Sequence, residues 1–379
     1  MATEVEQPIK TLERVNSYTE FLNSEGIPVI HGFAIADLKT VDVAPWARKG
    51  GRGAYINLEG TGGTNDAYVC EIAPGGALNP ERHLFEEMIY VVDGRGSTSV
   101  WYDEKQKRSF EWQTGSLFAI PLNARFQHFN LSGVRPARFL AVTTAPVVIN
   151  LFHNLRFIFD ADFMFDDRFA GQEQYFDGVG EIYQGRWSRR NTLVTNFLPD
   201  THNVELYEWR ARGAGGRNLM IELAHNTMAA HISEFPVGTY KKAHRHGPGA
   251  HVIILSGQGY SLLWPEGREP TQVDWQPGSM VVPPNQWFHQ HFNKGADPAR
   301  YLALRWGSQR YDMGAAFASD EGDTGRSGAD VSVKLGGWQI EFEDEDRAIH
   351  QQFESELARA GAHCRMKAEI PWCTAGTPG

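Results

Sequence analysis

Two stretches of the chain, "ERHLFEEMIYVVDGRGSTSVW" at residues 81–101 and "HRHGPGAHVIILSGQGYSLLW" at residues 244–264, follow one pattern. His83 and His246 are 163 positions apart (246 minus 83), and "QHFN" recurs at this offset, at residues 127–130 and 290–293. The offset continues through Gly94 and Gly257, Gly96 and Gly259, Trp101 and Trp264, Trp112 and Trp275, Gly115 and Gly278, and Pro121 and Pro284. Such an ungapped match indicates a duplication, so the sequence predicts one fold present twice.

Each copy contains short runs of β-branched, aromatic and other apolar residues. These runs include "MIYVVDG" at 88–94, "SLFAIP" at 116–121, "VIILSG" at 252–257 and "SMVVPP" at 279–284. Glycine, proline and asparagine bound them, and no strong helical period intervenes. The sequence therefore predicts an all-β protein built from two antiparallel barrels or jelly rolls, with a Gly-X-Gly hairpin turn in each copy.

The repeat divides the chain into five predicted segments. These are an N-terminal extension (1–49), a first barrel (50–149), a connecting segment (150–224), a second barrel (225–310) and a C-terminal loop and helix (311–379). The connecting segment is rich in Phe, Asp and Arg, and we interpret it as an ordered, lid-like element. In the last segment, Ile349, Phe353 and Leu357 at four-residue intervals predict an amphipathic helix that ends at Gly361.

Charge and composition limit the partners. The net charge of −10 argues against nucleic acid or an anionic membrane, because binding phosphates requires a basic surface. The N-terminal "MATEVEQPIKTLERVNSYTEF" has acidic residues where a secretory signal has an apolar core. Three scattered cysteines favour a reducing compartment over a disulfide framework. We therefore expect a soluble, cytoplasmic protein. The apolar stripe of the tail helix predicts docking on the protein or, alternatively, a subunit contact in a homo-oligomer.

Histidines gather in the second copy. Neighbours two apart on a strand face the same way, so His244 and His246 project together, and a barrel turns one such face inward. "GSMVVPPNQWFHQHFN" at residues 278–293 places His289 and His291 in the same relation. Two strands therefore offer as many as four inward imidazoles. Three unrelated core histidines are the alternative, and it is less favoured because both pairs lie at matching positions.

The spacings Gly-X5-His-X-His and Gly-X5-Pro-X4-His-X3-Asn resemble the double motif of the cupin superfamily. The residues that carry the resemblance are Gly238, His244, His246 and Gly257, followed by Gly278, Pro284, His289 and Asn293. The resemblance covers about residues 50–150 and 225–310. It implies a bicupin, which is a chain of two tandem cupin barrels of the jelly-roll type.

The resemblance also implies a metal site. The family's ligand positions fall on His244, His246 and His289, while Ala250 occupies the place of the usual glutamate. Three neutral imidazoles suffice for a divalent first-row metal and leave positions open for substrate and O2. Without the carboxylate the site is more positive, which favours an anionic substrate. An HRH followed by Ala is similar to gentisate-type ring-cleaving dioxygenases, so iron(II) is the first expectation, with manganese, nickel or zinc as alternatives.

Several further residues are candidates for catalysis or for the pocket wall. On a regular strand His251 faces away from Ala250, whereas a bulge would turn it inward as a fourth ligand. Arg305 is positioned on a late strand to meet a substrate carboxylate, although a surface or interface role is an equal alternative. His291 is a candidate for proton transfer or for a structural role, since "HFN" occurs in both copies. Three aromatic residues are candidates for the pocket wall or for the core: Tyr240, Tyr260 and Trp287.

The first copy lacks this ligand set. Its equivalent positions hold Glu81, His83 and Phe126, with Glu87 in the place of the glutamate. Phenylalanine offers no ligand atom, so we expect the first barrel to be structural.

The function predicted first is a mononuclear non-haem iron dioxygenase that cleaves a C–C bond or ring of a small hydroxylated aromatic acid or a related oxygen-rich molecule. A metal-dependent lyase, hydrolase or isomerase on the same site is one alternative. A bicupin that binds a metal or small molecule without turnover is another. Oxalate decarboxylase activity is not expected, because the resemblance implies that it requires a glutamate-containing site in both barrels. Fold alone does not separate these functions.

Overall fold

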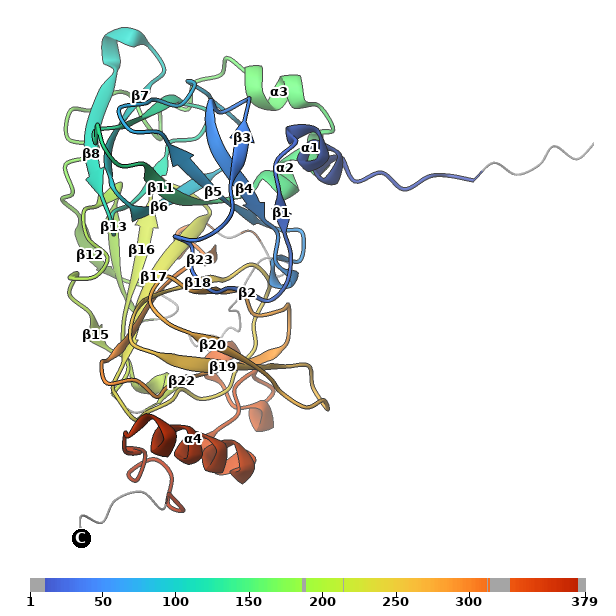
Figure 1. The fold of residues 1–379 in the computed structure, drawn as a ribbon, viewed down its shortest axis with the longest axis vertical. Helices are drawn as coiled ribbons and strands as arrows, with labels where there is room; N and C mark the ends of the chain where they lie inside the picture. The colour runs from blue at the N-terminus through green and yellow to red at the C-terminus, as the bar shows by residue number, and fades with distance from the viewer. Residues whose placement is uncertain (1–10, 186–188, 214, 312, 314–327, 374–379) are drawn as a thin grey trace, which may run out of the picture.

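The computed structural model describes residues 11–185, 189–213, 215–311, 313 and 328–373. Two β-barrels lie one above the other in Figure 1, and the C-terminal helix α4 (Arg347–Ala360) lies at the far end of the second barrel. The prediction of an all-β fold with two tandem barrels and a C-terminal helix is confirmed. Among the described residues, no helix combines the length and the apolar character that crossing a membrane requires.

The first barrel consists of a large and a small sheet. In spatial order, the large sheet contains β1 (Val29–Ile30), β4 (Gly51–Ile56), β5 (Asp66–Ile72), β11 (Ala137–Thr143), β6 (Glu87–Asp93), β9 (Leu117–Ile120) and β14 (Phe197–Leu198), with β3 (Ala44–Trp46) paired to β4. The small sheet has the order β10 (Arg125–Asn130), β7 (Arg95–Trp101) and β8 (Arg108–Gln113). Strand β6 is buried along most of its length, as its continuous apolar run predicts.

The second barrel repeats this arrangement. Its large sheet has the order β12 (Glu181–Gln184), β13 (Asn191–Thr195), β16 (Arg217–Leu223), β17 (Met228–Phe235), β23 (Ala299–Trp306), β18 (His251–Ser256), β21 (Met280–Val281) and β2 (Ala34–Ile35), with β15 (Tyr207–Glu208) paired to β16. Its small sheet has the order β20 (Thr271–Trp275), β19 (Gly259–Trp264) and β22 (Phe288–Asn293). Strands β10 and β22 begin and end 163 residues apart, so the duplication read from the sequence is also a duplication of structure.

The Gly-X-Gly motif has a different role from the predicted hairpin turn. It joins β18 to β19, which lie in different sheets. Gly257 has a φ of +83°, a conformation that other residues rarely adopt. A Cβ atom at Gly259 would lie 2.5 Å from the ring of Trp275, so only glycine allows this close approach. The first glycine therefore permits the turn, and the second permits the contact with the tryptophan of the motif.

The two barrels exchange short edge strands. Strand β2 lies before the first barrel in the chain but pairs with β21 of the second, and β14 lies before the second barrel but pairs with β9 of the first. The two exchanges occupy equivalent positions in the repeat. Ala34 pairs with Val281, and the residues 163 positions later and earlier, Phe197 and Phe118, also pair with each other. Backbone hydrogen bonds continue both contacts, from Leu38 N to the carbonyl of Gly278 and, correspondingly, between residues 201 and 115.

One hydrophobic core joins the large sheets of both barrels. It includes Met88 and Leu140 from the first barrel, Ile221 and Leu302 from the second, and Leu38 from the N-terminal segment. The boundaries drawn from the sequence therefore differ from the structure. Residues within 1–49 complete the second barrel, and residues 217–223, assigned to the connecting segment, form strand β16.

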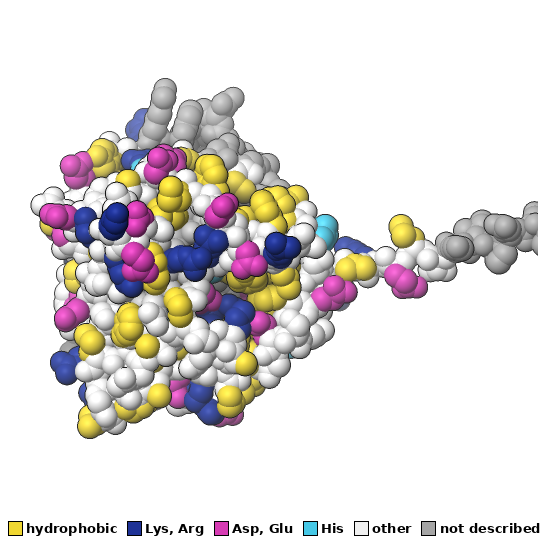
Figure 2. Space-filling model, turned by 90° about the horizontal axis from the view of Figure 1, so that it is seen from above, with side chains coloured by type: hydrophobic (Ala, Val, Ile, Leu, Met, Phe, Trp, Pro, Cys, Tyr) yellow, Lys and Arg dark blue, Asp and Glu magenta, His cyan; other side chains and the backbone are white. Residues whose placement is uncertain are grey.

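The first part of the connecting segment covers the first barrel. Helices α2 (Ala145–Phe152) and α3 (Leu155–Asp160) pack beside α1 (Ser17–Glu25), and Leu84 N donates to the carbonyl of Ile158 at 3.0 Å. Phe85 and Phe159 contact each other with ring centroids 5.8 Å apart. Figure 2 views the end of the molecule that holds these helices and shows hydrophobic side chains among charged ones. The helical start of the lid-like element predicted from sequence thus lies over the first barrel.

A buried carboxyl group holds α1 on the first barrel. Asp66 is almost fully buried at the start of β5, where it accepts hydrogen bonds from the hydroxyl of Tyr18 and from Ala67 N. Burial raises the pKa of Asp66 to about 8, and the two hydrogen bonds offset only part of this effect. The folded state therefore keeps a proton that the unfolded chain has released at neutral pH.

We predict that Leu38→Ala lowers the free energy of unfolding by about 2–5 kcal/mol, because it removes a fully buried side chain from the core shared by both barrels. Chemical denaturation measures the change, with Leu12→Ala as a control at a position that is 95% exposed. A loss below about 0.5 kcal/mol in the Leu38 variant would contradict the shared core.

We predict that Asp66→Asn becomes progressively more stable relative to the wild type as the pH rises from 4 towards 8. Below the unfolded pKa, near 3.8, both states of the wild type are protonated. Above it, only the folded state keeps the proton, so wild-type stability falls by up to about 1.4 kcal/mol per pH unit. Denaturation of both proteins at several pH values measures the difference. A difference independent of pH would show that Asp66 is ionised in the fold.

Candidate metal centre

Three of the predicted ligands meet at one end of the second barrel. His244 and His289 form an antiparallel bridge, in which each backbone N–H donates to the carbonyl of the other residue, at 3.1 and 2.9 Å. The rings of His244 and His289 have centroids 4.2 Å apart, and those of His246 and His289 are 4.6 Å apart. One ring nitrogen from each of the three lies within 4.8 Å of the others. The backbone bridge between the two motifs thus brings the three imidazoles together.

Each imidazole is held in one orientation by the backbone. The Nδ1 atoms of His244, His246 and His289 lie 3.2, 2.8 and 3.3 Å from the carbonyl oxygens of residues 242, 247 and 287. An Nδ1–H that donates to a carbonyl leaves the Nε2 lone pair available for a metal. Burial lowers the pKa of all three, to about 3 for His246, so the rings are neutral. The set fits a divalent first-row transition metal.

A cavity of about 50 Å³ adjoins the three histidines. Five basic residues line it: Arg190, Arg212, Arg217, Lys241 and Arg305. Asp330 is the acidic partner of two of them, at 2.9 Å from Arg190 and 3.1 Å from Arg212. Among the described lining residues, the basic groups outnumber the acidic ones. This environment favours an anionic ligand.

A lysine and a tyrosine form an interacting pair in the cavity wall. The Nζ of Lys241 donates to the hydroxyl oxygen of Tyr301 at 3.0 Å, and both side chains are buried. Burial lowers the pKa of Lys241. Burial alone would raise the pKa of Tyr301, but the charge and hydrogen bond of Lys241 outweigh it, and the net pKa is lowered. The pair is therefore suited to donating and accepting a proton.

Two polar atoms in the cavity wall have no hydrogen-bond partner within the described part of the chain. These are Oδ1 of Asn218 and Nδ1 of His231, both with negligible exposure. Buried polar atoms are nearly always paired in folded proteins. Their position beside the histidines indicates that a polar molecule belongs in this cavity.

His291 lines the cavity and is held from behind by a short hydrogen-bonded chain. Trp275 Nε1 donates to Ser261 Oγ at 3.1 Å, and Ser261 Oγ lies 2.7 Å from Nδ1 of His291. Trp112, Thr98 and His128 form the same chain in the first barrel, at 2.8 and 2.7 Å. This chain therefore belongs to the fold of both barrels, and only in the second does its histidine border a metal centre. Arg305, also predicted from sequence, borders the same cavity.

The structure does not bring His251 to the centre. Ala250 and Val252 line the cavity, so His251 between them faces the opposite side of the sheet, where its Nδ1 lies 3.1 Å from the carbonyl oxygen of Gly249. Its ring is fully buried. The bulge that would turn His251 inward as a fourth ligand is absent at this residue.

The three aromatic candidates for the pocket wall are packing residues instead. Tyr240 donates to Glu345 at 2.6 Å in a cluster with the tail helix, and Tyr260 stacks on Phe292 at 4.6 Å. Trp287 packs against an aromatic ring of the N-terminal segment at 5.8 Å. None of the three borders the described cavity. Tyr240 and Tyr260 lie on the outer face of the small sheet, which packs against α4.

Sequence reasoning missed several cavity residues. Arg190 and Arg212 come from the connecting segment, which shows no periodicity, so nothing in the pattern identified them. Tyr301 was accessible to such reasoning, since residues 301, 303 and 305 alternate along β23 and all line the cavity.

The first barrel carries ion pairs where the second has its ligands. Glu81 pairs with Arg48 at 2.6 Å and with Lys49, and Nε2 of His83 lies 3.0 Å from Oε2 of Glu87. Within the described residues, no metal-ligating group of three or more is found in this barrel. These contacts support the prediction that the first barrel is structural.

Comparison with known proteins identifies the repeated unit. The Cupin domain family model matches residues 68–143, which run from β5 to β11. The first barrel therefore resembles a cupin domain over these residues. The second cupin barrel repeats its strands at a constant offset, so the chain has the bicupin fold inferred from its histidine motifs. The family match falls on the cupin barrel that lacks the three histidines.

Solved structures with a similar arrangement include several bicupin enzymes. An oxalate decarboxylase of Bacillus subtilis with Mn(II) centres shares 15% identity, covers 81% of this chain and 87% of its own, and has a TM-score of 0.47. The oxalate decarboxylase of Lactobacillus farciminis in a formate complex shares 15% identity over 74% of this chain and 87% of its own, with a TM-score of 0.47. A search of curated proteins finds no match. At such low similarity the activity of these enzymes does not transfer to this chain, and the resemblance to gentisate-type dioxygenases stays a prediction from the sequence.

We predict that His289→Ala lowers the metal content of the purified protein by one ion per chain, because it removes one of three converging ligands. His251→Asn is the matched control, since it replaces a buried histidine of the same barrel that faces away, and it should retain the wild-type content. Elemental analysis beside thermal unfolding measures both. Loss of the same metal in the His251 variant would restore the four-ligand alternative.

Proposed function

We propose that the second cupin barrel is the active site of a metal-dependent enzyme that acts on a small carboxylic acid, with lyase chemistry as its reaction class. The observation that carries the proposal is the position of the Lys241–Tyr301 pair in a basic cavity beside three converging histidines. A reaction that makes or breaks a bond next to a carboxylate needs an anion site, a Lewis acid and a proton-transfer group. The cavity offers residues for all three roles.

The residues that line the cavity are assigned to these roles as follows. His244, His246 and His289 would hold the metal, which supplies a Lewis acid that polarises a substrate oxygen. The guanidinium groups of Arg212 and Arg305 are suited to bind the carboxylate, because a planar guanidinium matches it with two parallel hydrogen bonds. Burial of these groups excludes bulk water and strengthens their attraction to the anion.

The Lys241–Tyr301 pair would transfer the proton. The lysine ammonium stabilises a tyrosinate beside it, so Tyr301 can accept a proton from the substrate or return one at its hydroxyl oxygen. His291, 5.5 Å from Tyr301 between ring centroids, completes the wall on this side. A proton-transfer group beside a bound carboxylate suits lyase, hydrolase and isomerase reactions.

Cavity size supports a small substrate. A volume of about 50 Å³ is well below the roughly 150 Å³ of a protein cavity that binds benzene. The described cavity therefore suits an acid of a few non-hydrogen atoms better than the hydroxylated aromatic acid expected from the HRH-Ala resemblance. Oxygen chemistry on a small acid remains the second candidate, because three imidazoles without a carboxylate suit iron(II) as well as the other metals.

Reconstitution separates these reactions. The metal-free protein would receive Fe(II), Mn(II), Ni(II) or Zn(II) and then be assayed with small mono- and dicarboxylic, 2-oxo and hydroxy acids, and with gentisate and salicylate. Product formation and O2 uptake would be followed together. Turnover of a small acid without O2 uptake supports the proposal. Stoichiometric O2 uptake would favour the dioxygenase, and tight metal binding without turnover would favour a binding protein.

We predict that Tyr301→Phe lowers kcat by about 10²–10⁴-fold while the metal content stays unchanged, because it removes the proton-transfer group and leaves the three histidines intact. Tyr260→Phe is the control, since its hydroxyl is buried in the core and has no partner among the described residues. The kcat of both variants, measured on the acid found by reconstitution, tests the assignment. A Tyr301→Phe enzyme with wild-type kcat would exclude Tyr301 as the acid–base group.

A further inference from the structure

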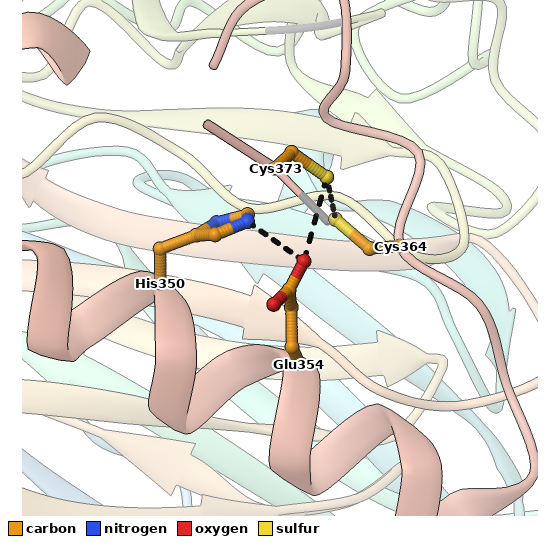
Figure 3. A group of neighbouring side chains, drawn as sticks. All are labelled: His350, Glu354, Cys364 and Cys373. Carbon is orange, nitrogen blue, oxygen red and sulfur yellow. Dashed lines mark hydrogen bonds and ion pairs between the residues drawn. The ribbon is translucent and has the colours of Figure 1, made fainter. Parts of the chain in front are cut away.

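A second group of metal-ligating side chains lies at the opposite surface of the second barrel, under the tail helix. His350 and Glu354 are one helical turn apart on α4, so they share a face of that helix. After the helix ends at Gly361 the chain turns back, and Cys364 and Cys373 meet this face. All four side chains point toward one another in Figure 3, and one ligand atom of each lies within 4.8 Å of the others.

The distances among these atoms suit a tetrahedral metal site. Nε2 of His350 is 3.2 Å from Oε1 of Glu354, Sγ of Cys373 is 3.6 Å from the same oxygen, and the two Sγ atoms are 3.3 Å apart. With the bond lengths usual for zinc, the corresponding edges of a tetrahedron are about 3.4, 3.6 and 3.8 Å. These three distances lie within about half an ångström of the corresponding edges of such a tetrahedron.

The hydrogen bonds around His350 leave its Nε2 available as a ligand. Tyr240 donates its hydroxyl proton to Glu345 at 2.6 Å, so its oxygen can accept a proton from Nδ1 of His350, 3.1 Å away. Gln290 donates to the other oxygen of Glu345 at 2.6 Å. A carboxylate that orients a metal-binding histidine through hydrogen bonds is a common support of protein metal sites.

We propose that His350, Glu354, Cys364 and Cys373 form a structural zinc site that fastens residues 364–373 to helix α4, which packs on the second barrel. Two thiolates with an imidazole favour zinc over magnesium or calcium, which prefer oxygen ligands. Four protein ligands fill a tetrahedral shell and leave no position for substrate, which makes the site structural. The ammonium of Lys367, bonded to the carbonyl of Cys373 at 2.9 Å, offsets part of the negative charge.

Packing contacts link the zinc site to the candidate active site, but the zinc proposal does not rest on the proposed function. Phe353 of α4 packs against Tyr240 and Phe292, with ring centroids 5.0 and 5.7 Å apart. Phe292 and Gln290 lie on β22, which also carries His289. The ion would therefore stabilise the outer support of a strand that holds an active-site ligand. This face of α4 is thus used within the chain, which removes the reason for expecting a subunit contact there.

Cobalt substitution of the full-length protein tests the site. Cobalt(II) bound by thiolates shows intense sulfur-to-metal charge-transfer absorption, which the three-histidine centre lacks because it contains no sulfur. We expect this absorption in the wild type and in His289→Ala. We expect its loss, with one zinc ion per chain, in the Cys364→Ser, Cys373→Ser double variant. Cys70→Ser, which changes the buried cysteine of the first barrel, is the matched control and should keep both.

Two results would overturn the zinc site. One is the absence of charge-transfer absorption from the cobalt-loaded wild type, a measurement that does not depend on whether any variant folds. The other is an intact mass showing that Cys364 and Cys373 remain joined in a disulfide in protein that has been kept with a reductant. His289→Ala changes the three-histidine centre and not the zinc site. The cobalt absorption therefore tests the zinc site independently of whether the proposed enzyme activity is found.

Discussion

The reciprocal exchange of edge strands is the constraint on which the rest of the structure depends. Strand β2 completes the large sheet of the second barrel and β14 completes that of the first, so neither cupin barrel is a closed unit by itself. Buried side chains from both large sheets then merge into one hydrophobic core. This core fixes strand β18 and its neighbours, and the ends of these strands support the loop that carries His244 and His246.

The two copies of one fold differ in the residues at their motif positions. Both keep the hydrogen-bonded chain of tryptophan, hydroxyl and histidine, but only the second places three neutral imidazoles in a basic cavity. The first fills the equivalent space with the ion pair of Glu81 and Lys49 and with the ring of Phe126. An ion pair and an aromatic ring stabilise the first barrel without a metal. In the second barrel, Oδ1 of Asn218 and Nδ1 of His231 in the cavity wall have no partner among the described residues.

Most of the fold and the ligand trio could be predicted from the sequence, because the duplication preserves spacing and a strand alternates its faces. The orientation of His251 away from the cavity also followed from strand alternation, because no bulge turns its side chain inward. The features that were not predicted are those set by contacts between segments distant in the chain. Arg190 and Arg212 reach the cavity from a segment without periodicity. Helix α4 buries the outer face of β22, so Tyr240 and Tyr260 are packing residues and not part of the pocket wall. The cysteines near the C-terminus lack a metal-binding spacing, and only the fold joins them to His350 and Glu354.

The strand exchange also has a consequence for the order in which the chain folds. Ala34 pairs with Val281, 247 residues further along (281 minus 34), so the first-made end of the chain must wait for most of synthesis before its partner leaves the ribosome. Contacts of such long sequence separation form slowly, since a large loop must close first. During part of this interval the first barrel also lacks β14. The nascent protein therefore exposes the edge of β9 until residues 197–198 are made, and it leaves β2 without a partner until residue 281 is made. Both are sites for chaperone binding or misassembly.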